Sequence, residues 1–174
     1  MSRLLIVVDY QNDFVDGALG FPGAEKLYEP ICARIEEYKR AGDSVVFTKD
    51  THTPEYPKTR EGKNLPVVHC VRGTRGHALY GRLEELSDGC RVFEKGTFGS
   101  DRLFDYLRSS GFESVELVGL VSNICVLSNA ALVQTALPEA MIVVDASLTD
   151  SFDKSLHEKA MDVLEGIQIR VTGR

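Results

Sequence analysis

Short apolar runs alternate with longer amphipathic stretches along the whole chain. Runs rich in Val, Ile and Leu predict strands near 3–8, 44–48, 91–94, 114–120, 140–145 and 167–171. Stretches in which apolar residues recur at every third or fourth position predict helices at about 24–41, 77–86, 100–110, 123–137 and 153–165. Because strands and helices alternate in this way in βαβ units, we expect an α/β fold, a three-layer α-β-α sandwich with a doubly wound, six-stranded and mainly parallel sheet.

The length of the chain fits one domain. Its 174 residues contain no internal repeat, low-complexity tract or linker, and domains most often contain about 100–150 residues. Hydrophobic residues make up 43% and charged residues 26% of the sequence, which is typical of a globular protein. We therefore expect a single domain over 1–174.

The net charge and the lengths of the apolar segments disfavour nucleic acids and membranes as partners. The formal net charge is −6, which disfavours nucleic acid because binding to phosphates needs clustered Lys and Arg. No apolar stretch of the sequence approaches the roughly 20 residues of a membrane-spanning helix, so no membrane partner is expected. The start of the chain lacks the pattern of a signal peptide, and the four cysteines show no CxxC spacing. These features predict a cytoplasmic protein with reduced thiols.

Three apolar runs each lead to a reactive side chain. Asp9 follows 4–8, Lys95 follows 91–93 and Cys125 follows 115–121. The carboxyl ends of parallel strands lie along one edge of a sheet, where ligands bind, so we expect these side chains to converge there. An acid, an amine and a thiol at one edge form a nucleophile with its activating partners.

Cys125 is the candidate nucleophile. It lies at the apparent first turn of the helix predicted at 123–137, and a helix N-terminus or a nearby cation lowers the pKa of a thiol from its free value of about 8.5. The N–H groups of the same turn can hold an oxyanion. The alternative is a structural cysteine, because cysteines are often buried without a chemical role.

Asp9 and Lys95 are the candidate partners of that thiol. A carboxylate after an apolar strand and near a thiol should have a raised pKa and could take the thiol proton, whereas a turn or N-cap aspartate is the alternative. A lysine near the thiol would stabilise a thiolate or an oxyanion, whereas a solvated surface lysine is the alternative. Each alternative is common for a residue taken alone, but the coincidence of all three favours the chemical interpretation.

The segment 50–69 contains a second group of candidate residues. Asp50 and His52 are two positions apart just after a predicted strand and project to the same side, and His69 follows a loop long enough to return to them. Glu55 and Glu61 lie within this loop. A mixture of carboxylate and imidazole suits zinc, manganese or iron.

The metal interpretation competes with plain surface residues. A D-x-H pattern with a later His is by itself a weak signal, because loop histidines are often exposed. The other two histidines, His77 and His157, have no such context and are expected on helix surfaces.

Three segments carry a resemblance to a known family. The segments IVVDYQNDF, FEKGTF and GLVSNICV resemble the signature blocks of the isochorismatase-like cysteine hydrolases, which include nicotinamidases, N-carbamoylsarcosine amidases and isochorismatases. The resemblance implies a catalytic triad of Asp9, Lys95 and Cys125, in which Asp9 takes the proton from the thiol that attacks an amide carbonyl. Ammonia leaves, and water hydrolyses the thioester. The resemblance also implies a cis peptide between Leu120 and Val121 and an oxyanion hole formed by the N–H groups of Val121 and Cys125.

The segment 50–69 further resembles the metal site of nicotinamidases. This resemblance implies one divalent ion, zinc first and iron or manganese as alternatives, that anchors a pyridine nitrogen. The residues that match the ligand positions are Asp50, His52, His69 and, as the third ligand, Glu61, with Glu55 as second choice.

The walls of the substrate site depart in part from that pattern. Phe14 matches one aromatic wall, whereas the segment LPVVH before the last ligand replaces the usual aromatic-Pro-Pro-His, and the chain has no Trp. Stacking contributes only about 0.5–1.5 kcal/mol beyond burial, so nicotinamide stays the first substrate hypothesis. We expect a cysteine amidohydrolase, by resemblance a homo-oligomer, that acts on nicotinamide or a related small amide. The alternatives are a metal-independent hydrolase of the same superfamily with another substrate, and a ligand-binding protein without catalysis.

Overall fold

The strands form one sheet in the order β3-β2-β1-β4-β5-β6. The computed structural model describes residues 2–174, and within these residues every pairing between the six strands is parallel. The strands are β1 (Arg3–Val8), β2 (Ser44–Asp50), β3 (Arg91–Lys95), β4 (Ser114–Leu120), β5 (Met141–Asp150) and β6 (Arg170–Thr172). The expected sheet is confirmed, and its chain order reverses direction at β1, which makes it doubly wound.

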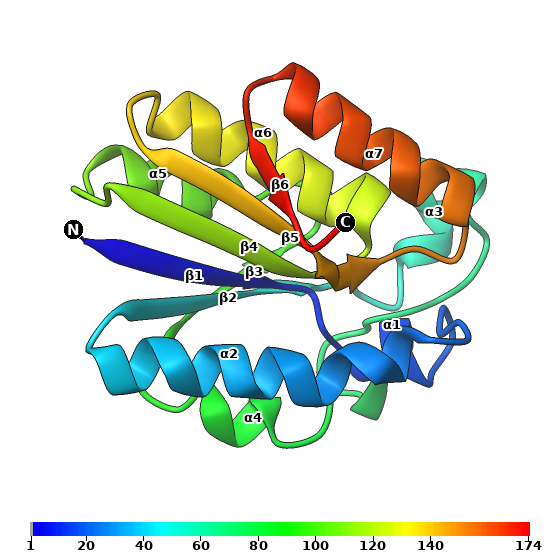
Figure 1. Ribbon diagram of the computed structural model, residues 1–174. Helices are drawn as coiled ribbons and strands as arrows, with labels where there is room; N and C mark the ends of the chain where they lie inside the picture. Colours follow the sequence, from blue (N-terminus) through cyan, green and yellow to red (C-terminus); the bar gives the residue numbers. More distant parts are fainter. Residues whose placement is uncertain (1) are drawn as a thin grey trace.

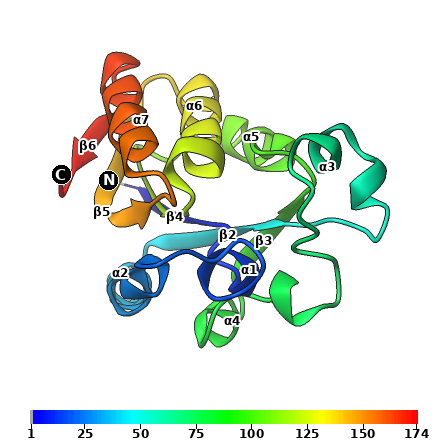
Figure 2. The same cartoon turned by 90° about the vertical axis from the view of Figure 1, so that its right-hand side faces the viewer.

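Helices cover both faces of the sheet and so form the expected three layers. In Figures 1 and 2, α2 and α4 lie below the sheet, and α5, α6 and α7 lie above it. The helices are α1 (Asn12–Val15), α2 (Tyr28–Ala41), α3 (Arg60–Asn64), α4 (Leu83–Leu86), α5 (Asp101–Arg108), α6 (Leu127–Ala136) and α7 (Lys154–Gly166). Short helical turns are η1 (Ala24–Leu27), η2 (Tyr56–Lys58), η3 (Arg75–His77) and the π-helical η4 (Ser122–Val126).

The core consists of two apolar layers, one on each face of the sheet. Successive residues of the central strand β1 alternate between them, because side chains on a strand point to opposite faces in turn. Leu5 and Val7 pack with Ile31 and Ile35 of α2, whereas Leu4 and Ile6 belong to the layer under α5, α6 and α7. Burial on both faces explains why β1 reads as an unbroken apolar run.

The prediction of a helix at 77–86 is wrong. The chain forms the turn η3, then an extended segment, and only a single helical turn at α4. Leu79 forms an antiparallel bridge with Gln11, and Gly81 adopts a left-handed backbone with φ of +57°, so both residues leave the helical conformation. A contact distant in sequence therefore overrides the local apolar spacing.

The remaining differences are at the ends of elements and in the long connections. The last strand begins at Arg170 rather than 167, and β5 extends to Asp150. The connections 9–23 and 50–76 carry the short helices α1 and α3, which the apolar pattern did not predict. Both helices lie beyond the arrowheads of the strands in Figure 1, at the carboxyl edge of the sheet.

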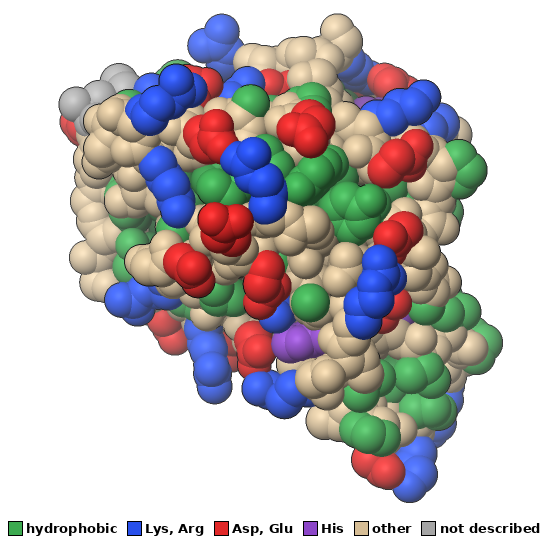
Figure 3. Space-filling view, turned by 90° about the horizontal axis from the view of Figure 1, so that it is seen from below, with side chains coloured by type: hydrophobic (Ala, Val, Ile, Leu, Met, Phe, Trp, Pro, Cys, Tyr) green, Lys and Arg blue, Asp and Glu red, His purple; other side chains and the backbone are tan. Residues whose placement is uncertain are grey.

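The surface carries charges of both signs. Figure 3 shows Lys and Arg interspersed with Asp and Glu over the face of α2 and α4. This mixture agrees with the negative net charge and gives that face no continuous basic patch. None of the helices in residues 2–174 has the length and apolar character needed to span a membrane.

Candidate active site

Asp9, Lys95 and Cys125 converge at the carboxyl edge of the sheet. Asp9 follows β1, Lys95 ends β3, and Cys125 lies in η4 just after β4. The Lys95 Nζ atom lies 2.6 Å from Oδ2 of Asp9 and 3.6 Å from Sγ of Cys125. The side chains of all three residues are buried. The predicted convergence of acid, amine and thiol is therefore present.

The Asp9 carboxylate is held by side chains of β2 and β3. Its backbone has a φ of +44°, a left-handed conformation that Asp tolerates better than most residues. Thr48, the partner of Val8 across the β1–β2 ladder, donates a 2.6 Å hydrogen bond to Oδ1. Burial raises the pKa of Asp9, and the positive charge of Lys95 opposes that effect. A carboxylate with a raised pKa is suited to accept a proton.

The pKa of Cys125 does not follow the expectation from its position. Burial, and then the negative charge of Asp9, raise the pKa of the thiol well above its ordinary value, against the opposing charge of Lys95. The turn around Cys125 is π-helical, and the α-helix begins only at Leu127. The sequence-based prediction of a lowered pKa is wrong, because desolvation dominates at a side chain that is 5% exposed. The sulfur is a thiol until a base removes its proton.

Lys95 is a buried cation and not a surface lysine. Its ammonium group donates to the Thr97 carbonyl at 3.0 Å and contacts Asp9. Burial alone would lower the pKa of Lys95, but the negative charge of Asp9 outweighs it and raises the pKa. Lys95 therefore carries its positive charge beside the sulfur.

The turn that carries Cys125 is bound to its surroundings on both sides. The peptide between Leu120 and Val121 is cis, as the family resemblance implied. Gly119 has a φ of +112°, and a Cβ atom there would lie 2.1 Å from the Val8 carbonyl oxygen, so only glycine permits this approach of β4 to β1. The buried Asn129 of α6 donates to the Cys125 carbonyl at 2.8 Å, which fixes the far end of the turn.

A group of four possible ligand residues lies beside the triad. Oδ2 of Asp50 is 2.9 Å from Nε2 of His52 and 3.2 Å from Nε2 of His69. Glu61 Oε1 lies 3.8 Å and 4.0 Å from the same two nitrogens. The four ligand atoms lie within 4.8 Å of one another. Nζ of Lys95 is 3.9 Å from Oδ1 of Asp50, so the two groups of residues are parts of one site.

The donor set fits a divalent transition-metal ion. His69 Nδ1 donates to the Val67 carbonyl at 2.7 Å, which leaves the Nε2 lone pair of the neutral ring for a metal. Burial would raise the pKa of Asp50, but its contacts with the two imidazoles and the positive charge of Lys95 outweigh it and lower the pKa, so this carboxylate is ionised. Two imidazoles with two carboxylates favour zinc, iron or manganese over magnesium.

Glu61 and not Glu55 lies in this group. Glu61 is in the first turn of α3, and the Thr59 side chain caps that helix by accepting from the Gly62 N–H at 2.9 Å. Glu55 is exposed and pairs with Lys58 instead. The second choice for the third ligand is therefore excluded by its position.

Sequence analysis missed three residues that shape the site. The ring of Tyr56 packs against His52 and His69 at centroid distances of 4.6 Å and 4.9 Å. Thr48 binds Asp9, as described above, and Gln11 binds the backbone of Asp50 on both its N–H and its carbonyl. A polar residue inside the apolar run before Asp50 was the available signal for Thr48, but nothing local marks the other two.

The other two histidines are less exposed than expected. His77 is buried in η3, where its Nε2 lies 2.8 Å from the Thr51 hydroxyl, and burial lowers its pKa. His157 lies on α7 but turns inward, because its Nδ1 is 3.0 Å from Oγ of Ser122. The prediction of two surface histidines is wrong, since both rings contact distant loops.

Phe14 of α1 lies on the side of the site expected for an aromatic wall. Its ring centroid is 5.7 Å from that of His69, and the residue is 8% exposed.

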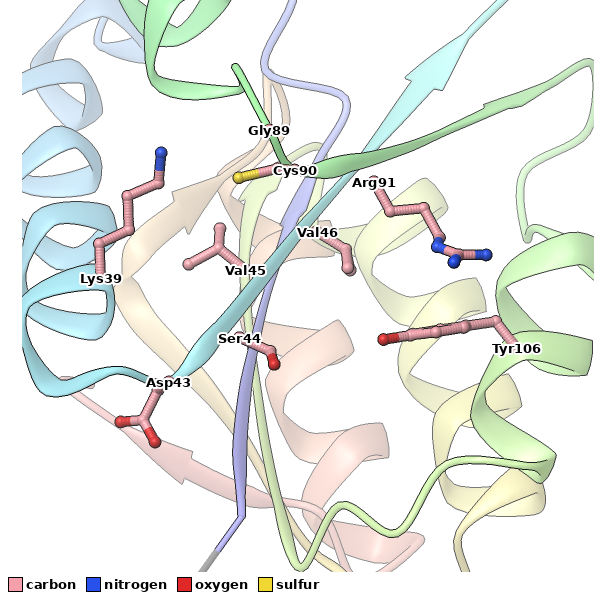
Figure 4. Close-up of a pocket in the computed structure, with 9 residues that line it drawn as sticks. All are labelled: Lys39, Asp43, Ser44, Val45, Val46, Gly89, Cys90, Arg91 and Tyr106. Carbon is pink, nitrogen blue, oxygen red and sulfur yellow. The ribbon is translucent and has the colours of Figure 1, made fainter.

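A separate hollow of about 270 Å³ lies at the amino ends of β2 and β3, where Figure 4 shows the Arg91 side chain beside Tyr106. None of the triad or ligand residues lines that hollow.

The comparisons with known proteins agree with this geometry. The isochorismatase domain model matches residues 3–173. The chain is 33% identical to the uncharacterized isochorismatase family protein PncA of Bacillus subtilis, over 92% of this chain and 93% of the relative. It is 32% identical to the nicotinamidase/pyrazinamidase of Mycobacterium tuberculosis, over 74% and 76% of the two chains. The crystal structure of nicotinamidase/pyrazinamidase PncA from Bacillus subtilis superposes with a TM-score of 0.87 at 30% identity, over 99% of this chain and 100% of that chain. The chain therefore belongs to the isochorismatase family.

Proposed function

We propose that this protein is a cysteine amidohydrolase that cleaves nicotinamide or a related small amide to the acid and ammonia. The observation that carries the proposal is the buried contact of Lys95 with both Asp9 and Cys125, directly beside a four-residue ligand group. Relatives that bear the name nicotinamidase support the amide as substrate class.

The first half of the reaction forms a thioester. Asp9 takes the proton from the Cys125 sulfur, and the thiolate attacks the amide carbonyl, so that a C–S bond forms. The C–N bond then breaks, and the proton held by Asp9 passes to the nitrogen, which leaves as ammonia. The raised pKa of Asp9 makes this carboxylate a stronger base toward the Cys125 thiol, whose own pKa is also raised.

The second half hydrolyses the thioester. Asp9 takes a proton from water, the hydroxide adds to the carbonyl carbon, and the C–S bond breaks. The proton held by Asp9 then passes to the sulfur, which regenerates the thiol and releases the acid. In both halves Lys95 places positive charge beside the sulfur. The N–H groups of Val121 and Cys125 hold the carbonyl oxygen as it becomes negative.

The ligand group orients the substrate. Asp50, His52, Glu61 and His69 would hold one divalent ion, with zinc as the first candidate and iron or manganese as alternatives. When bound, the ion supplies an open coordination position for the ring nitrogen of a pyridine amide. Phe14 provides one wall of the ring site.

Release of ammonia tests this function. The wild-type protein, loaded with zinc, is assayed with nicotinamide, pyrazinamide and an N-carbamoyl amine, with and without a chelator, beside Cys125→Ala as control. We expect turnover of at least one pyridine or pyrazine amide, its loss on chelation, and none with Cys125→Ala. Turnover that chelation leaves unchanged would favour the metal-independent hydrolase. Absence of turnover on the whole panel would contradict the proposal.

Three further expectations belong to this proposal. The family model over 3–173 supports one domain over 1–174. The homo-oligomer stays a prediction, which sedimentation velocity tests. The cytoplasmic location also stays a prediction, which fractionation of the source cells tests.

A further inference from the structure

The turn η4, which carries Cys125, contacts α7, the last helix of the chain. Ser122, the first residue of η4, is fully buried. Its Oγ lies 3.0 Å from Nδ1 of His157 on α7, and the two atoms share a hydrogen bond. The Oδ1 atom of Asp150, at the end of β5, lies 4.0 Å from the same nitrogen. Ser122 thus meets two residues of the distant segment that runs from the end of β5 into α7.

Hydrogen bonds fix the first turn of α7, which carries His157. Its backbone N–H donates to the Asp153 carbonyl at 2.9 Å, in the first turn of α7. The Asp153 side chain caps that helix by accepting from the Leu156 N–H at 3.0 Å. Asp150 is fixed by the Ser151 N–H at 2.7 Å and by an ion pair with Lys154. The imidazole therefore offers Ser122 a stationary partner.

This cluster is not a second catalytic centre. A Ser-His-Asp triad uses the two ring nitrogens separately, one toward the hydroxyl and the other toward the carboxylate. Here the hydroxyl and the carboxylate face the same nitrogen, Nδ1. Ser122 is also 0% exposed, so a substrate cannot reach its hydroxyl. The cluster must therefore act through the backbone of η4, which it holds in place.

The cluster holds the backbone between Val121 and Cys125, whose N–H groups are the two candidate oxyanion donors. Ser122 directly follows Val121 and precedes Cys125 by three positions, and the Val121 carbonyl accepts from the N–H groups of Ile124 and Val126 at 3.2 Å. We propose that His157, acting through Ser122, is a positioning residue that fixes the N–H groups of Val121 and Cys125 for the negative oxygen of the reaction. This inference rests on the proposed function. Errors of about 1 Å in such a position can cost about 100-fold in rate.

Steady-state kinetics provide the first test. We expect His157→Ala and Ser122→Ala each to lower kcat by about 10-fold to 100-fold with little change in KM, because the lost interaction acts in the transition state. His157→Asn, whose amide can reach the place of Nδ1, should recover most of the loss. The double variant should be no worse than the worse single variant, since both act through one hydrogen bond. Lys159→Ala, an exposed residue of the same helix, is the matched control, and thermal unfolding checks that each variant folds.

Two kinds of covalent probe, aldehydes and an alkylating agent, distinguish a loss of positioning from general damage to the site. Pyridine-3-carboxaldehyde and propanal react when the Cys125 thiol adds across the carbonyl, so that a C–S bond forms and the former carbonyl oxygen takes the proton. The N–H groups of Val121 and Cys125 would donate hydrogen bonds to this oxygen, so the adduct depends on their position. Iodoacetamide alkylates the same sulfur with loss of iodide and needs no such hydrogen bonds. We expect His157→Ala to weaken aldehyde binding about tenfold or more and to leave the alkylation rate within about twofold of wild type.

The outcomes distinguish this inference from the proposed function. Equal losses in aldehyde binding and alkylation, or an unchanged kcat in His157→Ala, would overturn the role of His157. A wild-type protein that hydrolyses no amide would overturn the proposed function. In that case the ratio of aldehyde binding to alkylation still decides whether His157 positions the turn.

Discussion

Gln11 holds the backbone of Asp50 from both sides. Its Oε1 accepts from the Asp50 N–H at 2.7 Å, and its Nε2 donates to the Asp50 carbonyl at 2.8 Å and to the His77 carbonyl at 2.9 Å. Two positions away, Asp13 accepts from the N–H of Cys70, the residue after His69, at 2.7 Å. The segment that begins with the proposed base thus also aligns two of the proposed metal ligands.

Substitution of Gln11 should therefore weaken metal binding as well as the fold. Gln11→Leu leaves buried backbone groups of Asp50 without partners, and each such group costs about 1–3 kcal/mol. We expect a lower free energy of unfolding and weaker zinc binding, measured by denaturant titration and by competition with a chelator. Gln134→Leu removes a side-chain bond to the Ile167 carbonyl far from the site, and it should lower stability alone. Equal zinc affinities in the two variants would refute the role of Gln11.

The thiol should respond in opposite directions to the loss of its two charged neighbours. Asp9→Asn removes the negative charge that raises the pKa of Cys125, so the pKa should fall and iodoacetamide should react faster at a fixed pH. Lys95→Met removes the opposing positive charge, so the pKa should rise and the reaction should slow. A charge at such distances shifts a pKa by about 1–3 units, which predicts rate changes of about tenfold or more. The measurement is the alkylation rate as a function of pH.

Amide hydrolysis in Asp9→Asn completes that prediction. Asp9→Asn should lose hydrolysis although its thiol is more reactive, because an amide cannot take the thiol proton. Slower alkylation in Asp9→Asn than in wild type would contradict the assigned charge balance.

Loss of one ligand should separate substrate binding from nucleophile reactivity. His52→Ala should lower zinc affinity more than about 100-fold and raise KM for a pyridine amide, while iodoacetamide still reacts with Cys125. Zinc at 100 times its Kd should stabilise the wild type by about 2.7 kcal/mol, and the variant much less. His77→Gln, a buried histidine outside the ligand group, is the control and should keep the zinc effect. Full zinc stabilisation in His52→Ala would exclude the proposed site.

Tyr56 should act on the metal site through packing rather than through charge. Burial raises its pKa to about 12, so its hydroxyl is neutral at ordinary pH and donates to the Leu65 carbonyl at 3.0 Å. Tyr56→Phe should cost about 0.5–1.5 kcal/mol of stability and keep zinc affinity. Tyr56→Ala removes the ring that packs against both histidines and should weaken zinc binding, as calorimetry can measure. Similar zinc affinities in Phe and Ala variants would argue against this packing role.

The sheet and the triad were predictable because they depend on local patterns. Strands buried on both faces read as continuous apolar runs, and the rule that carboxyl ends share one edge was sufficient to bring Asp9, Lys95 and Cys125 together. Asp50 and His52 were found for the same reason, since Asp50 ends β2 and His52 lies two residues further along.

What could not be predicted depends on contacts between distant segments. The segment 78–82 leaves the helical conformation because Leu79 pairs with Gln11, and His77 is buried because Thr51 binds it. The pKa of Cys125 rises because neighbouring elements desolvate it, which its position near a helix start does not reveal. Such burial becomes known only when the layers are assembled.

The central claim is that the substrate is held covalently on Cys125 during the reaction. Acid quench of the zinc-loaded protein during turnover of nicotinamide, followed by mass spectrometry of the peptide that contains Cys125, tests it most directly. We expect a nicotinoyl group on Cys125 in the wild type, and neither this adduct nor ammonia release in Cys125→Ala. Steady ammonia release by Cys125→Ala, or an adduct on another residue, would contradict the thioester mechanism.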